Sequence, residues 1–129
     1  MVFLTPFKLL KDGRPIGVED LKPSDIFRHI IRRAFLLEYL YNGRMLAWMS
    51  PSYVREFKEW ADEDIVLEKR LRESSVKVKG SGGFLEGIMI LKMRDGSRSC
   101  EILKHLKIGE MIGIGKNASY GYGQYKLMI

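Results

Sequence analysis

The chain has 129 residues, of which 46% are hydrophobic and 29% charged, a balance that excludes a disordered chain and leaves room for one globular domain over residues 1–129. The formal net charge is +6, and the excess lies in the second half: residues 1–64 carry ten basic and ten acidic side chains, residues 65–129 twelve and six. Cys100 is the single cysteine, which excludes an internal disulfide. No apolar run approaches the roughly 20 residues that span a bilayer. We therefore expect a cytoplasmic protein without a membrane partner.

Residues 2–10 are mostly apolar and predict a first strand, with Pro6 indicating an edge or a bulge. A turn cluster follows at residues 11–15. Ser24 then predicts the N-cap of a helix that runs to about residue 41, where Asn42-Gly43 ends it.

This helix has two distinct faces. Apolar side chains recur at three- and four-residue spacing and predict the core-facing stripe: Phe27, Ile30, Ile31, Ala34, Leu37 and Tyr41. Arg28, Arg32 and Arg33 lie on the remaining surface. Two interpretations stay open for these cations, a solvated helix face or a surface that contacts RNA.

Residues 44–49 read as a hydrophobic connector, and Ser50-Pro51 predicts a second helix to about residue 72. The acidic run at residues 61–64 interrupts the apolar stripe of this helix, so the segment could also form two separate helices. Residues 76–79, a turn at residues 80–83 and an apolar run at residues 84–92 predict a β-hairpin.

Ser97 or Ser99 predicts the cap of a short helix through Leu106, and residues 111–115 and 121–128 predict two final strands. The resulting fold class is α+β: a ferredoxin-like (split βαβ) antiparallel sheet with a helical insert and an extra carboxy-terminal strand. Such sheets commonly leave one face open for a ligand, including RNA.

Five of the thirteen glycines fall in residues 109–123, including the pairs Gly113/Gly115 and Gly121/Gly123. Glycine weakens a strand, so this spacing indicates close backbone approach or positive φ. Lys116, Asn117 and Ser119 lie between the pairs. For Gly121 and Gly123 alone we favour a tight turn that packs against a helix; for the whole loop we favour contact with RNA.

Nucleotide-binding motifs do not fit this loop. Residues 113–118 match G-x-G-x-x-A, but only 11 residues follow Ala118, too few for a Rossmann unit. A P-loop is excluded because Glu110 occupies the position of the motif's first glycine, and because Asn117 replaces the serine or threonine that follows the lysine. No Cys/His pattern for zinc is present, so we expect no cofactor or metal. A glycine-lined groove with basic flanks remains, which suits a phosphate backbone.

Four segments resemble the carboxy-terminal domain of the CRISPR-associated endoribonucleases that process precursor CRISPR RNA, within the repeat-associated mysterious protein superfamily. They are residues 4–8 (LTPFK), 30–33 (IIRR), 82–87 (GGFLEG) and above all 106–127 (LKIGEMIGIGKNASYGYGQYKL). The resemblance implies that residues 113–123, with a basic hairpin around Lys77 and Lys79, bind CRISPR repeat RNA.

The resemblance also implies tandem ferredoxin-like domains, metal-independent cleavage by the 2′-hydroxyl, and a catalytic histidine in the amino-terminal domain. The chain therefore reads as an RNA-binding half whose catalytic residues are unknown, with an absent amino-terminal domain, a split-gene partner or a homodimer mate as possible complements. The alternative is a structural or protein-interaction subunit of a CRISPR ribonucleoprotein. A third possibility, cleavage through His29 or His105, leaves the enzyme question open.

Overall fold

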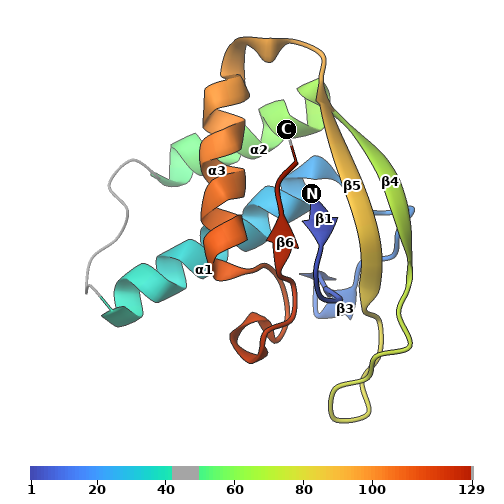
Figure 1. The fold of residues 1–129 in the computed structure, drawn as a ribbon. Coiled ribbons are helices and arrows are strands. Elements are labelled where there is room, and N and C mark those ends of the chain that lie inside the picture. The colour runs from blue at the N-terminus through green and yellow to red at the C-terminus, as the bar shows by residue number, and fades with distance from the viewer. Residues whose placement is uncertain (42–49, 129) are drawn as a thin grey trace.

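The computed structural model describes residues 1–41 and 50–128. Four antiparallel strands form its main sheet in the order β4-β5-β1-β6: β1 Val2–Phe3, β4 Ile65–Glu73, β5 Leu85–Met93 and β6 Tyr125–Lys126. Three helices cover one face of this sheet (Figure 1): α1 Pro23–Tyr41, α2 Pro51–Asp64 and α3 Ser99–Ile112. Strands β1, β4, β5 and β6 with helices α1 and α3 give the βαββαβ order of the ferredoxin-like fold, which confirms the predicted class. Helix α2 is the predicted helical insert.

The short elements lie at the ends of the sheet. Strands β2 Leu10–Lys11 and β3 Arg14–Pro15 form a small hairpin across the predicted turn. The 3₁₀ turns are η1 Gly96–Arg98 before α3 and η2 Ala118–Tyr120 after it.

The core lies between the sheet and the helices. As predicted, α1 buries Phe27, Ile30, Ile31 and Ala34, while Leu37 is half-buried; the Tyr41 side chain lies outside the described part of the chain. Helix α2 contributes Phe57, whose ring meets that of Phe27 edge-on at 5.1 Å between centroids. Aromatic pairs of this geometry stabilise beyond their buried area.

The predicted N-cap is correct for helix α2 but not for helix α1. Ser50 caps α2 as predicted, since its Oγ accepts a hydrogen bond from the Tyr53 N–H at 3.2 Å. Ser24 is not the cap of α1, because the helix begins one residue earlier at Pro23. There the Asp25 carboxylate accepts from the Lys22 N–H at 2.9 Å, so the third helical residue satisfies the donor that precedes the helix. Asn42-Gly43 and residues 44–49 lie outside the described residues.

The predicted second helix extends too far. Residues 65–72 form β4, which pairs with β5 from Ile65↔Met93 to Glu73↔Leu85. Ile65, Leu67 and Leu71 are spaced by two and four residues, which suits one face of a strand as well as a helix. The acidic run at residues 61–64 is the last turn of α2.

The predicted hairpin is therefore displaced. Its first strand is β4, and residues 76–79 belong to the connection between β4 and β5, where one isolated bridge joins Val78 to Ser81. Because β4 already supplies nine paired residues to β5, residues 76–79 have no unpaired strand to join.

Both terminal predictions need correction. Residues 2–10 form no continuous strand: β1 ends at Phe3, and Pro6, which lacks an N–H, precedes an isolated Phe7↔Leu85 bridge. Residues 111–115 form no strand, because α3 continues to Ile112 and ends where the Gly113 N–H bonds the Gly109 carbonyl at 2.8 Å. In the described chain only β6 follows α3, so the prediction of an extra carboxy-terminal strand was wrong. Neither Ser97 nor Ser99 caps α3, whose N-cap position is Arg98 and has no side-chain capping bond; Asp95 caps the preceding turn η1, where it accepts from the Ser97 N–H.

Candidate RNA-binding site

Residues 113–123 form a loop pinned against the start of the chain. The Lys116 N–H bonds the Lys8 carbonyl and the Gly123 N–H bonds the Pro6 carbonyl, both at 2.8 Å. The Ile114 N–H closes the loop on the Gly123 carbonyl at 3.0 Å. These bonds fix the loop at one end of the sheet (Figure 1), so the groups it presents are held in place before any ligand binds.

Two glycines are required by the backbone packing. Gly115 (φ +86°) and Gly123 (φ +74°) have left-handed conformations, and a Cβ there would overlap the carbonyl oxygens of Lys8 and Ile114 respectively. Gly121 also has positive φ, +93°, but a Cβ there would have nothing within 4 Å. Close approach and positive φ are both confirmed, although they arise in a loop rather than in two strands.

The tip of the loop carries several hydrogen-bond donors. Asn117 is left-handed (φ 60°, ψ 25°) and leads into η2. Within the described chain, the N–H groups of Asn117, Ala118 and Ser119 have no hydrogen-bond partner. The Lys116 and Ser119 side chains are exposed. Successive unpaired N–H groups beside a lysine are suited to anionic oxygens.

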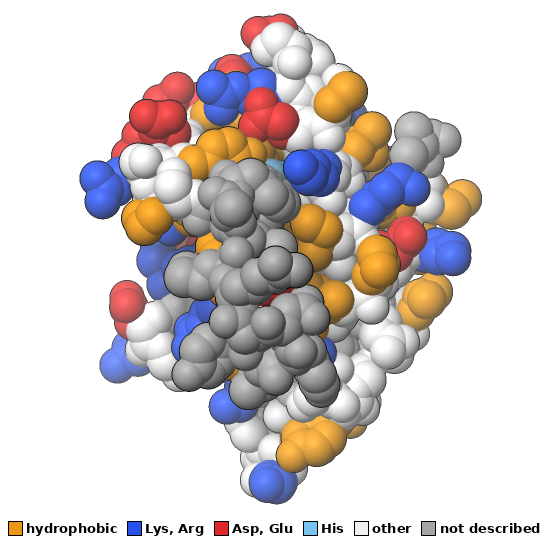
Figure 2. All heavy atoms as spheres, turned by 90° about the vertical axis from the view of Figure 1, so that its left-hand side faces the viewer, with side chains coloured by type: hydrophobic (Ala, Val, Ile, Leu, Met, Phe, Trp, Pro, Cys, Tyr) orange, Lys and Arg blue, Asp and Glu red, His pale blue; other side chains and the backbone are white. Residues whose placement is uncertain are grey.

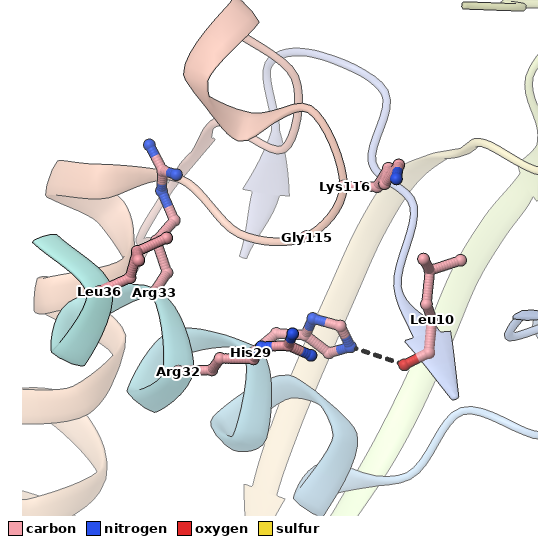
Figure 3. A pocket seen from close by; sticks show the side chains of 7 residues that line it. All are labelled: Leu10, His29, Arg32, Arg33, Leu36, Gly115 and Lys116. Atoms are coloured by element: carbon pink, nitrogen blue, oxygen red, sulfur yellow. Dashed lines mark hydrogen bonds between the residues drawn. The ribbon is translucent and has the colours of Figure 1, made fainter. Parts of the chain in front are cut away.

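Helix α1 brings cations to this loop. A pocket of about 240 Å³ is lined by Leu10, His29, Arg32, Arg33, Leu36, Gly115 and Lys116. Figure 3 shows Lys116 from the loop on one side of it and α1 on the other. We call this the cationic pocket. Arg32, Arg33, Gly115 and Lys116, which the sequence suggested separately, meet here.

Arg33 and Arg32 differ in how they are held. The Arg33 Nε donates to the Ile112 carbonyl at the end of α3, at 2.7 Å, which orients the guanidinium and leaves its terminal nitrogens to donate. Arg32 is exposed and, among the described residues, has no ion-pair partner. Arg28 does not line the pocket: it donates to the Leu10 carbonyl at 2.9 Å and pairs with Asp25 at 3.4 Å.

A second, larger cleft of about 850 Å³ lies on the other side of the loop. Gly113, Ser119 and Gly121 line it together with Tyr120 and Arg33, so Arg33 contributes to both hollows. Gly123 is buried and lines neither hollow; Asn117 lines neither as well.

Lys77 and Lys79 are exposed on the connection between β4 and β5. This connection and the glycine loop lie at the same end of the molecule (Figure 1). Phe84 contacts Tyr122 of the glycine loop, with ring centroids 5.1 Å apart, and Lys8 Nζ donates to Ser81 Oγ at 2.9 Å. The two basic segments are thus neighbours, but Lys77 and Lys79 stand outside the cationic pocket.

The two histidines have different environments. His29 lies in the cationic pocket, with its Nε2 3.0 Å from the Leu10 carbonyl oxygen, and burial lowers its pKa. Its neutral form therefore carries the proton on Nε2 and leaves Nδ1 as an acceptor. His105 is completely buried and stacks on Phe57 at 4.2 Å between centroids, so it faces no substrate.

The open face of the sheet is unlike a base-stacking surface. The strand register puts Val2, Ile88 and Arg70 side by side on it. On this face the charged side chains of β4 and β5 are ion-paired, as in Arg72–Glu86 at 2.8 Å. Among the described residues Lys126 of β6, which is in register with Val2, makes no ion pair, and the other outward side chains are aliphatic. RNA-binding sheets of this architecture use aromatic rings, which the outward positions of these strands lack.

In the described part of the chain, no group of three or more His, Cys, Asp or Glu side chains could hold a metal ion, and no helix has the length and apolarity to cross a bilayer.

The fold and the site define a ferredoxin-like domain with a basic pocket beside a glycine loop, a combination whose donors suit the phosphates of a nucleic acid. The model of the family CRISPR-associated endoribonuclease Cas6 matches residues 1–125, and the chain belongs to this family. Membership implies a role in processing CRISPR repeat RNA. No curated protein matches the chain.

Proposed function

We propose that this chain holds CRISPR repeat RNA against the cationic pocket and the glycine loop, and that the catalytic base comes from another domain or chain. One observation carries the proposal: Arg32, Arg33 and Lys116, from segments some 80 residues apart, converge on one hollow in a member of an RNA-processing family.

The site matches the chemistry of a phosphodiester backbone. Phosphate oxygens accept hydrogen bonds from backbone N–H groups and from guanidinium and ammonium groups, and such contacts position an RNA without reading its sequence. The unpaired N–H groups of residues 117–119 and the terminal nitrogens of Arg33 supply both kinds of donor. Lys77 and Lys79 extend the positive surface toward the flanking RNA.

The salt dependence of repeat-RNA binding tests this proposal. Each phosphate contact contributes about 0.7–0.9 to the slope of log K against log salt. Lys116→Ala should reduce the slope by about that amount and weaken binding about tenfold at low salt. Lys107→Ala removes another exposed lysine, from a position of α3 that lines neither hollow, and serves as the matched control. Equal affinities and slopes for the two variants would contradict the proposal.

A second candidate function is cleavage by this chain itself, favoured by His29. Its Nδ1 could accept the proton of a 2′-hydroxyl as that oxygen attacks the neighbouring phosphorus. The bond from phosphorus to the 5′ oxygen then breaks, and that oxygen takes a proton from water, which leaves a 2′,3′-cyclic phosphate and a 5′-hydroxyl. Arg32 and Lys116 would stabilise the charge that develops on the phosphate.

Incubating the chain with repeat RNA in EDTA tests the second candidate. His29→Gln keeps a donor for the Leu10 carbonyl but removes the basic nitrogen that would take the proton, so the rate should fall about 100-fold or more. Cleavage that is absent in the wild-type chain, or unchanged in His29→Gln, would refute His29 as the base and leave RNA binding untouched.

A further inference from the structure

A groove of about 420 Å³ runs between α1 and α2, beside the cationic pocket. Arg28 and Arg32 of α1 and Arg55 and Lys58 of α2 line it. In the described chain, Arg32, Arg55 and Lys58 make no ion pair. Three uncompensated cations on one groove concentrate positive potential and attract an anionic ligand.

The floor of the same groove is apolar. Ile31, Phe35 and Val54 line it, and all three pack within or against the core. A ligand that suits this groove is therefore amphipathic: it has an anionic backbone for the rim and flat apolar groups for the floor. Single-stranded RNA has this character, because its phosphates follow basic side chains while its bases stack on aromatic and apolar surfaces.

The groove is continuous with the cationic pocket. Arg32 lines both hollows, so one side chain can contact consecutive parts of one strand. On their other side Arg55 and Lys58 also line a hollow of mixed charge, which they share with the acidic Asp25, Glu59 and Asp62 and with two further cations, Lys11 and Arg28. Figure 2 views the helical side, where basic, acidic and hydrophobic side chains are mixed. The cationic pocket and the groove, joined at Arg32, thus extend from the glycine loop to α2.

We propose that the groove between α1 and α2 is a second RNA subsite, which binds a single-stranded segment of the same RNA that the cationic pocket holds. This inference rests on the proposed function and deepens it. It assigns to the helical insert α2 a role in binding that no motif in its sequence indicates.

Four versions of the chain test the inference by fluorescence anisotropy with labelled repeat RNA. The groove variant is Arg55→Ala/Lys58→Ala. The control, Arg94→Ala/Lys107→Ala, removes the same charges from exposed positions that line none of these hollows. Lys116→Ala reports on the cationic pocket, and Arg55→Lys/Lys58→Arg keeps both charges.

The groove variant should bind about 5- to 30-fold more weakly than the control, with a salt slope lower by about 1.4–1.8 for two lost contacts. The charge-preserving variant should bind like the wild type. A truncated RNA of about 4 nucleotides is too short to occupy both hollows at once, so the groove variant should weaken its binding less than it weakens binding of the full repeat RNA.

The outcomes separate the two proposals. If Lys116→Ala weakens binding while the groove variant matches the control, the groove inference is overturned and the proposed function stands. If the groove variant instead loses a protein partner at unchanged RNA affinity, the inference is also overturned. If the wild-type chain does not bind repeat RNA, both proposals fail. Thermal melts of all four proteins exclude unfolding as the cause.

Discussion

Gly115 and Gly121 offer a matched pair for asking which glycines the fold requires. Replacing either by alanine places a side chain at positive φ, which costs about 1 kcal/mol. At Gly121 that is the whole effect, because nothing lies within 4 Å of the new Cβ. At Gly115 the Cβ overlaps the Lys8 carbonyl oxygen, the acceptor of the Lys116 N–H.

The additional cost at Gly115 has two parts. Moving the Lys8 carbonyl weakens a hydrogen bond, at about 1 kcal/mol, and the displaced backbone adds about 1–3 kcal/mol of strain. We therefore expect Gly115→Ala to lower the free energy of unfolding by about 3–5 kcal/mol and Gly121→Ala by about 1 kcal/mol.

Urea unfolding followed by circular dichroism measures both differences. The same proteins can be tested for RNA binding at a temperature where each is folded. Gly121→Ala should retain the loop anchors and hence most of its affinity. Equal stabilities for the two variants would refute the account of loop packing.

Three further predictions follow from single contacts. Tyr125→Phe removes a buried donor to the Leu106 carbonyl and should cost about 1–2 kcal/mol, seen as a lower melting temperature; an unchanged melting temperature would contradict this role. Burial lowers the pKa of His29 below its ordinary 6.5, so the unfolded chain binds the proton more readily than the folded chain. The stability present above pH 6.5 should therefore be lost as pH falls through the lowered pKa, and it should be lost less steeply in His29→Gln. Urea midpoints with the same pH dependence in both proteins would contradict this prediction. Asn117 is left-handed, so Asn117→Gly should keep the stability better than Asn117→Ala in the same melts, and the reverse order would refute the assigned conformation.

The sequence predicted correctly the features that depend on neighbouring residues, such as side-chain spacing along a helix and helix caps. The three- and four-residue spacing of Phe27, Ile30 and Ile31 fixed the buried face of α1, and Ser50-Pro51 fixed the start of α2. The helix predicted over residues 65–72 was wrong because their apolar spacing fits either a strand or a helix. Pairing with β5 makes them a strand. Residues 111–112 extend α3, which approaches Tyr125 and Ile30 closely at Gly109, and such contacts are distant in sequence.

The candidate site shows the same division. Positive φ at Gly115 and Gly123 was foreseeable from glycine spacing. The meeting of Arg33 with Lys116 depends on how α1 packs beside the loop, and no spacing rule contains that information. The orientation of His29 depends on the Leu10 carbonyl, and the groove between α1 and α2 depends on where the insert docks. These features could only be found from the three-dimensional arrangement.

Photocrosslinking of 4-thiouridine-labelled repeat RNA, with mass spectrometry of the attached peptides, tests the central claim most directly. Trypsin releases residues 117–126 as one peptide that contains the exposed Tyr120. We predict crosslinks on this peptide and on the peptide that begins after Arg33. Crosslinks confined to residues 86–92 of β5, on the open face of the sheet, would contradict the claim that the cationic pocket and the glycine loop hold the RNA.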